Sequence, residues 1–247
     1  MENYSSIKLP IFHIETFGAV DGPGIRLVIF TQGCGYRCLF CHNPESWSIE
    51  VTKTITPEEI LEKFKRNREF YDANSGGVTF SGGEPTLHIK SLIPICKLLK
   101  ENNIHVAIDT AAMTYTDANH NRWEELIKYV DLFILDIKHL YPNEHKIITG
   151  VDFNYELSLL KFLEEKKHPY WLNQVYLNTY MDDKYFGELG KLLTTLNYCK
   201  RFQILPYHDL ALPKYQNLHI DYPGKHLKVP TSDEIKHAMA IINKHLK

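Results

Sequence analysis

The chain of 247 residues carries 28 Lys and Arg against 30 Asp and Glu, a net charge of −2, and 44% of its residues are hydrophobic. This length and apolar fraction suit one large domain with a sizeable core, and the balanced charge excludes an extended basic surface for nucleic acid. No run approaches the ~20 apolar residues of a membrane-spanning helix, and the N-terminus lacks an apolar signal segment. We therefore expect a cytoplasmic protein without a membrane partner.

Short apolar segments rich in β-branched residues alternate with segments of helical periodicity. The predicted strands are residues 25–30, 77–81, 104–108, 132–137, 170–177 and 201–205. The predicted helices start after Thr56, cover residues 89–101, 123–130, 155–165 and 183–196, and close the chain from Thr231 to about Lys244. Residues 7–17 are predicted to be an extended segment, and Pro10 favours a sheet edge because it has no N–H to donate.

This alternation requires parallel strands with covering helices. Six such repeats are too few for an eight-stranded barrel. We therefore predict an α/β fold, a partial (β/α)6 barrel of parallel strands with outer helices or an open doubly wound sheet. No linker or low-complexity tract divides the chain, so a single domain over residues 1–247 is expected.

Three cysteines with the spacing C-x3-C-x2-C, Cys34, Cys38 and Cys41, directly follow the first predicted strand. Soft sulfur ligands at this spacing suit an iron–sulfur cluster or zinc. A four-iron cluster held by three cysteines leaves one iron with an open coordination position. In a structural zinc protein, a remote His would have to complete the site. The remaining cysteines, Cys96 and Cys199, are predicted to be small apolar core residues.

Polar residues and glycines stand on the other predicted strands or directly after them, and barrel-like folds carry out their chemistry at the C-terminal ends of their strands. They are Ser81–Pro85, Asp109, Thr110, Asp136–Lys138, Asn173, Gln174 and Pro206–His208. Asp136 and Lys138 lie two residues apart on a strand and so face the same side. They form either a buried ion pair or a binding site for a zwitterion. Gly82 and Gly83 suit either an ordinary turn or a close approach to a ligand, and Asp109 either a ligand or a helix cap.

The cysteine spacing, with the aromatic Phe40 before the last Cys, resembles the signature of radical S-adenosylmethionine enzymes. Further stretches resemble the activating enzymes of glycyl-radical enzymes, above all the pyruvate formate-lyase branch. They are Asp21–Arg26, Gln32–Cys34, Cys41–Pro44, Ser81–Pro85, Leu135–Lys138 and Leu205–His208. Many activases of other glycyl-radical enzymes carry a cysteine-rich insert after the first motif. Only Cys96 and Cys199 lie beyond Cys41 here, which favours the pyruvate formate-lyase branch.

The resemblance implies a 4Fe-4S cluster on Cys34, Cys38 and Cys41 whose open iron chelates S-adenosylmethionine. Reductive cleavage would yield a radical that abstracts hydrogen from a backbone glycine of the partner enzyme. The implied cofactor-binding residues are Phe40, Cys41 and His42 at the adenine, Gly82, Gly83 and Glu84 at the methionine amino end, and Asp136, Ile137, Lys138, Asn173 and His208 at the carboxylate, ribose or adenine. Asp109, Thr110 and Asp136 match a monovalent-cation site, and the segment from Asp21 to Arg26, with Asp21 as a catalytic residue, matches the contact with the partner's glycine loop.

The implied partners are pyruvate formate-lyase as protein substrate and a flavodoxin or ferredoxin as electron donor, and we expect a monomer. Two departures bear on this expectation. Ala111 and Ala112 stand where the family has Asn or Ser and then Gly, which would restrict the turn to non-glycine torsions. Asn173 replaces an Arg and cannot supply charge to a carboxylate. The alternatives are activation of another glycyl-radical enzyme, radical chemistry on a small molecule, and the structural zinc protein.

Overall fold

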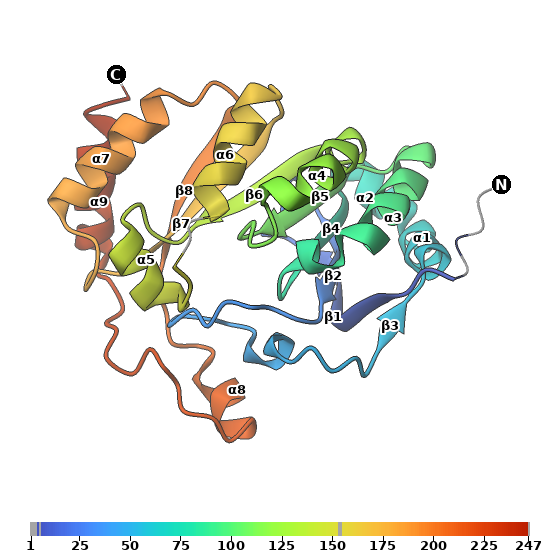
Figure 1. The fold of residues 1–247 in the computed structure, drawn as a ribbon, viewed down its shortest axis with the longest axis horizontal. Helices are drawn as coiled ribbons and strands as arrows, with labels where there is room; N and C mark the ends of the chain where they lie inside the picture. Colours follow the sequence, from blue (N-terminus) through green and yellow to red (C-terminus); the bar gives the residue numbers. More distant parts are fainter. Residues whose placement is uncertain (1–3, 5, 153–154, 247) are drawn as a thin grey trace. The chain divides into compact units, whose positions relative to one another are not determined.

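The structure is a computed structural model that describes Tyr4, residues 6–152 and residues 155–246 (Figure 1). The chain divides into two compact units. The first comprises residues 1–35 and 45–134, and the second comprises residues 36–44 and 135–247. The prediction of a single domain remains a prediction, and the two units are described separately below.

Hydrogen-bonded strands in the first unit follow the order β3-β1-β2-β4-β5-β6. Their bounds are β1 Leu9–Gly18, β2 Arg26–Thr31, β3 Thr54–Ile55, β4 Gly77–Gly82, β5 Val106–Thr110 and β6 Leu132–Ile137, of which residues 132–134 belong to this unit. Strands β2, β4 and β5 are parallel, as predicted, whereas β1 runs antiparallel to both β2 and β3. The predicted edge position of Pro10 is wrong, because the short strand β3 pairs with β1 there and forms the edge itself.

The register brings the ends of the central strands to one edge of the sheet. Thr31 at the end of β2 pairs with Gly82 at the end of β4. Strand β5 lies two residues later than predicted, so Asp109 and Thr110 are its last residues instead of following it. Residues that follow these strands are therefore held beside one another by the strand pairing.

The helices of the first unit are α1 Pro57–Lys65, α2 Arg68–Ala73, α3 Ile89–Glu101 and α4 His120–Leu126. Helix α1 begins with the predicted capping box between Thr56 and Glu59. Helix α3 packs against β5, α1 and α4, and its buried residues include Leu92, Cys96 and Leu99. Burial also raises the pKa of the Cys96 thiol well above its usual value, which confirms that Cys96 is a core residue.

The second unit contains residues 135–137 of β6, then β7 Tyr170–Tyr176 and the parallel β8 Cys199–Pro206. Its helices are α5 Pro142–Thr149, α6 Tyr155–Glu165, α7 Asp183–Thr194, α8 Leu212–Asn217 and α9 Ser232–Asn243. Helices α7 and α9 lie side by side (Figure 1), and α9 begins with the predicted capping box between Thr231 and Glu234. The sequence did not predict α5 and α8.

The six predicted parallel strands are all present, and the strand order ends at β3 and β8 without closing. The α/β fold with an incomplete barrel is thereby confirmed, with two antiparallel strands added at one edge. In the part of the chain that the structure describes, no helix combines the length and the apolar character needed to cross a membrane.

Two glycines on α7 differ in the space available for a side chain. A Cβ at Gly187 would meet its nearest neighbour, the imidazole of His245, at an ordinary 3.8 Å. We expect Gly187→Ala to raise the free energy of unfolding by about 0.5–1 kcal/mol, because Ala loses less backbone entropy in a helix. Gly190→Ala is the matched control. Its Cβ would lie 2.8 Å from His245 and 3.1 Å from the Ile242 carbonyl oxygen, so it should not stabilise. Urea denaturation of both variants measures the difference.

Candidate functional site

The cysteine segment, defined as residues 34–41, begins three residues after β2 and has little regular structure. Cys34 belongs to the first unit, whereas Cys38 and Cys41 belong to the second. Cys38 is buried, and Cys34 and Cys41 are partly exposed. Within the described part of the chain, no group of three or more His, Cys, Asp or Glu side chains is arranged to hold a metal ion. The three-cysteine ligand set therefore stays a prediction from the sequence.

Gly82 and Gly83 hold the backbone that leads into Cys34. The Gly83 N–H donates to the Thr31 carbonyl at 3.0 Å, and the Glu84 N–H donates to the Gly33 carbonyl at 2.8 Å. A Cβ at Gly83 would lie 2.2 Å from the Gly33 oxygen, and Gly82 has a φ of +107°. The glycine pair therefore permits a close backbone approach to the residue before Cys34. This contact is with the protein itself, and the predicted contact of the pair with a ligand stays a prediction.

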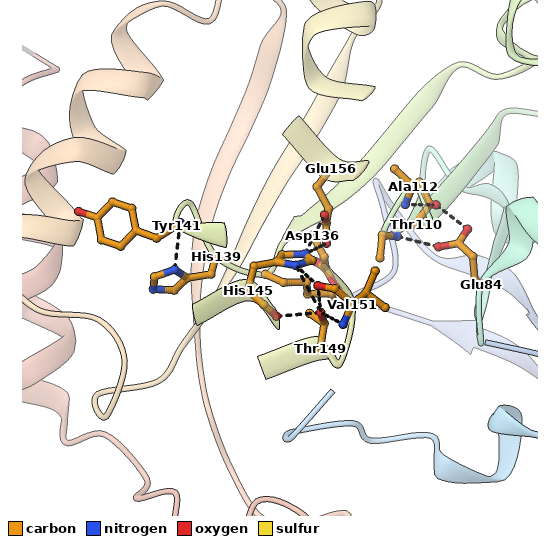
Figure 2. A network of polar contacts seen from close by, with 12 residues as sticks. Glu84, Thr110, Ala112, Asp136, His139, Tyr141, His145, Thr149, Val151 and Glu156 are labelled. Atoms are coloured by element: carbon orange, nitrogen blue, oxygen red, sulfur yellow. Dashed lines mark hydrogen bonds and ion pairs between the residues drawn. The ribbon is translucent and has the colours of Figure 1, made fainter. Parts of the chain in front are cut away.

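The buried Glu84 carboxylate connects the ends of β4 and β5 (Figure 2). Its Oε1 accepts hydrogen bonds from the Thr110 hydroxyl at 2.6 Å and from the Thr86 N–H at 3.0 Å. Its Oε2 accepts one from the Ala111 N–H at 2.9 Å. Burial raises the pKa of Glu84 despite these hydrogen bonds, which favour the ionised form. Glu84 thus positions the turn after β5.

The turn after β5 keeps a glycine-like torsion without glycine. Ala112 is fully buried with a φ of +58°, and its N–H donates to the Thr110 hydroxyl at 2.8 Å. The expectation that losing Gly would restrict this turn to non-glycine torsions is therefore wrong. At the end of the same strand, the Ser81 hydroxyl donates to Oδ2 of Asp109 at 2.7 Å. Asp109 and Thr110 are thus both in contact with the end of β4.

In the second unit, Asp136 and Lys138 form the ion pair that their spacing allows. Lys138 Nζ lies 3.0 Å from Oδ2 of Asp136 and 5.6 Å from the ring centroid of Phe40. Burial alone would lower the pKa of Lys138, but the negative groups around it, Asp136 above all, together raise this pKa. The other oxygen, Oδ1 of Asp136, is buried and has no hydrogen-bond partner among the described residues. The pair thus keeps one buried acceptor for a further cation or donor.

His42 and His208, both implied by the resemblance to contact the cofactor, lie against each other. Their rings stack with centroids 4.2 Å apart, and His42 Nε2 lies 3.3 Å from the His208 carbonyl oxygen. Burial lowers the pKa of His42. Within the described chain, Nδ1 of His208 is buried without a hydrogen-bond partner. Nδ1 of His208 is therefore a second buried polar atom that a ligand could satisfy.

Helix α8 holds the far end of the cysteine segment, a role that the sequence analysis missed. The Tyr215 hydroxyl donates to the Cys41 carbonyl at 3.1 Å. The Lys214 ammonium donates to the His42 carbonyl at 2.9 Å and to Oδ1 of Asn43 at 3.1 Å. These donors are supplied by a six-residue helix that carries no motif of its own, so no local signal pointed to them.

On β7, Asn173 and Gln174 point to opposite faces of the strand. Gln174 is buried, and its Oε1 accepts a hydrogen bond from the Tyr185 hydroxyl. Its Nε2 lies 3.4 Å from the Lys138 carbonyl oxygen, so Gln174 braces the strand end. Asn173 is partly exposed and Ile137 is buried, and their predicted contacts with the cofactor stay predictions.

The segment Asp21–Arg26 lies at the start of β2, the opposite end of that strand from the cysteines. Arg26 is fully buried and donates to the carbonyl oxygens of Pro23 at 3.0 Å and Val78 at 2.7 Å, and to the Thr79 hydroxyl. Burial lowers the pKa of Arg26 to about 10, and it raises the pKa of Asp21. The first unit thus does not bring Asp21 together with Cys34 or Gly82.

Replacing Arg26 tests whether it organises this loop. Arg26→Met leaves several buried acceptors unpaired, so we expect a loss of at least about 3 kcal/mol in the free energy of unfolding. Arg26→Lys keeps the charge but cannot reproduce the planar set of guanidinium donors. Its loss in the free energy of unfolding should be smaller than that of Arg26→Met. Urea denaturation gives both values. Equal stability of the Met variant and the parent would show that these hydrogen bonds contribute nothing net.

Substitution of Ala112 tests the left-handed torsion. We expect Ala112→Val to lose about 2 kcal/mol or more, because a β-branched residue is strained at positive φ and overfills a buried position. Ala112→Gly should change stability by less than about 1 kcal/mol, because relief of strain and added unfolded-state entropy oppose each other. Thermal or urea denaturation distinguishes them. A Val variant as stable as the parent would contradict the required torsion.

Comparison with known proteins agrees with these observations. A family model described as a 4Fe-4S single cluster domain matches residues 20–149. The pyruvate formate-lyase-activating enzyme of Staphylococcus aureus is 38% identical over 241 residues, which cover 96% of this chain and 96% of that protein.

Two solved structures have a similar fold. A domain of the pyruvate formate-lyase-activating enzyme from Bacteroides vulgatus has a TM-score of 0.57 and 24% identity over 69% of this chain and 94% of that one. Streptococcus suis SuiB bound to S-adenosylmethionine has a TM-score of 0.68 and 19% identity over 92% of this chain and 48% of that one. From the sequence similarity over nearly its whole length, the chain belongs to the radical S-adenosylmethionine family of the pyruvate formate-lyase-activating enzymes.

Proposed function

We propose that this protein activates pyruvate formate-lyase by generating a glycyl radical in it. The observation that carries the proposal is the 38% identity, over 96% of both chains, with a pyruvate formate-lyase-activating enzyme. Membership of the family makes a 4Fe-4S cluster and S-adenosylmethionine the cofactors. When bound at Cys34, Cys38 and Cys41, the cluster would supply one electron to S-adenosylmethionine, and the resulting cleavage would provide the radical that takes a hydrogen atom from a backbone glycine of the partner.

Cys34, Cys38 and Cys41 are the proposed cluster ligands, and their surroundings support this role. Three cysteine thiols at this spacing supply the soft donors that iron–sulfur clusters require. The backbone before Cys34 is held by Gly83 and Glu84, and the carbonyl of Cys41 is held by Tyr215. The protein thereby fixes the backbone beside the first and last ligand with hydrogen bonds that do not involve the thiols.

The second unit contains buried polar atoms that fit S-adenosylmethionine. Buried polar atoms in native proteins nearly always have a partner, so Oδ1 of Asp136 and Nδ1 of His208 are candidates for ligand contacts. An ammonium group suits the Asp136 oxygen, and a ribose hydroxyl or adenine amine suits the His208 nitrogen. Phe40 and His42 would lie at the adenine, and Lys138 would stay ionised near the carboxylate because its pKa is raised.

The remaining roles are proposed from the family resemblance. Asp109, Thr110 and Asp136 would bind a monovalent cation, and the loop Asp21–Gly24, fixed from within by Arg26, would contact the glycine loop of pyruvate formate-lyase. The electron donor would be a flavodoxin or ferredoxin, and the enzyme would act as a cytoplasmic monomer. The two hydrogen bonds from Arg26 and Thr79 to the carbonyls of this loop give it a defined shape for such a contact.

Cys38→Ala tests the cluster and the reaction together, with Cys96→Ala as the matched control. After anaerobic reconstitution with iron and sulfide, we expect the Cys38 variant to lose the dithionite-bleachable visible absorption and to form no 5′-deoxyadenosine. The Cys96 variant should retain both, since Cys96 lies in the core of the first unit. Production of 5′-deoxyadenosine by the Cys38 variant would contradict the ligand assignment, and a colourless parent protein with one tightly bound zinc would contradict the function.

The partner is tested by electron paramagnetic resonance. Reconstituted enzyme, S-adenosylmethionine and dithionite should produce the doublet of a glycyl radical when pyruvate formate-lyase is added. The same mixture with another glycyl-radical enzyme should produce none. A doublet with the other enzyme alone would assign this protein to a different partner while preserving the chemistry.

A further inference from the structure

Cys38 is flanked by two backbone hydrogen bonds to the end of helix α5. The Arg37 N–H donates to the Thr149 carbonyl at 2.8 Å, and the Leu39 N–H donates to the Ile148 carbonyl at 2.9 Å. The last carbonyls of a helix have no partner within it, so α5 presents acceptors at this point. Since the cysteine segment has little regular structure of its own, these bonds set the backbone on both sides of Cys38.

The end of α5 is itself fixed by a fully buried pair, His145 and Glu156 (Figure 2). His145 Nε2 lies 3.1 Å from Oε2 of Glu156, which is on α6, and Nδ1 lies 3.1 Å from the Val151 carbonyl oxygen. The Thr149 hydroxyl donates to the His145 carbonyl at 2.8 Å and accepts from the Val151 N–H at 3.1 Å. This network joins the last turn of α5, the chain after it and α6.

The same histidine also contacts the cysteine segment directly. The rings of Tyr36 and His145 meet edge to face with centroids 5.9 Å apart, and Tyr36 is buried. Both nitrogens of His145 face oxygen atoms, so the pair is satisfied either by a doubly protonated ring beside a carboxylate or by a neutral ring beside a protonated carboxyl. Each arrangement is neutral overall, and removing either partner leaves a buried polar group unpaired.

We propose that the His145–Glu156 pair is a positioning device for the cysteine segment. It acts through α5: the pair fixes the Ile148 and Thr149 carbonyls, and these hold Arg37 and Leu39 around Cys38. His145 and Glu156 are thus positioning residues and not ligands. The inference depends on the proposed function in one respect, the role of Cys38 as a cluster ligand, whereas the positioning itself is a property of the metal-free chain.

Hydrogen exchange of the metal-free protein tests the proposal, with the amides of Arg37 and Leu39 as the probes. Glu156→Leu has a similar volume but leaves Nε2 of His145 unpaired, so exchange at both amides should accelerate by about tenfold or more. Glu156→Gln should restore protection. A ring protonated on Nδ1 can donate to the Val151 carbonyl and accept from the Gln amide. If Glu156 acted only through packing, the Leu and Gln variants would show the same exchange rates at these amides.

Leu189→Ala on α7 is the control for general destabilisation, since Leu189 is fully buried on a helix that packs against α9. In this variant, hydrogen exchange at the amides of Arg37 and Leu39 should accelerate no more than the loss of global stability explains. The proposal is overturned if Glu156→Leu accelerates these amides no more than Leu189→Ala does, or if Glu156→Gln fails to restore them.

If Glu156→Leu does not fold, Thr149→Val decides, because it removes only the hydroxyl that joins His145 and Val151. Faster exchange at Arg37 and Leu39 supports the proposal, and unchanged exchange overturns it. In the reconstituted protein, the electron paramagnetic resonance spectrum of the dithionite-reduced cluster should be broader in Glu156→Leu than in the parent. In Glu156→Gln it should resemble the spectrum of the parent. If the parent protein binds no iron, the proposed function is contradicted. The hydrogen-exchange result, which is measured on the metal-free protein, is unaffected.

Discussion

The conformation of the cysteine segment depends on the hydrogen bonds that its backbone makes. The cysteine segment contains no helix or strand, and apart from the bond from the Cys41 N–H to the Cys38 carbonyl at 3.1 Å, much of its backbone hydrogen bonding comes from other elements. Gly83 and Glu84 bond to the chain ahead of Cys34, the end of α5 accepts from Arg37 and Leu39, and α8 donates to Cys41 and His42. These hydrogen bonds around the cysteines thus hold the backbone and not the thiols.

Much of the fold could be predicted, because several parallel strands are largely apolar runs and helices α1 and α9 begin with capping boxes. The fold prediction failed for short elements, whose formation depends on the segments that they pair with or pack against. Strand β3 has two residues, too few for any periodicity, yet it takes the edge position expected for Pro10. Helices α5 and α8 are short, and α8 has six residues. Helices of this length depend on tertiary contacts more than on their own sequence.

The residue types of the site could be predicted, but their partners could not. Asp136 and Lys138 form one of the two arrangements that their spacing on a strand allowed, an ion pair, whereas the stacking of His42 on His208 was not predicted. The hydrogen bonds of Arg26 could not be predicted, because its acceptors Val78 and Thr79 are more than fifty positions away. The torsion of Ala112 could not be inferred either, because the Glu84 carboxylate that holds Thr110 and Ala111 in this turn follows a different strand, β4.

The contact between α8 and the cysteines also has a consequence for biosynthesis. The hydroxyl of Tyr215 and the carbonyl of Cys41 are separated by 174 positions. A ribosome adding about 5–20 residues per second needs roughly 10–35 s to make that stretch. During this interval the thiols have left the exit tunnel without the donors that later hold their backbone. The thiols are therefore synthesised well before Tyr215, and the hydrogen bond that holds the Cys41 carbonyl can form only after this stretch has been made.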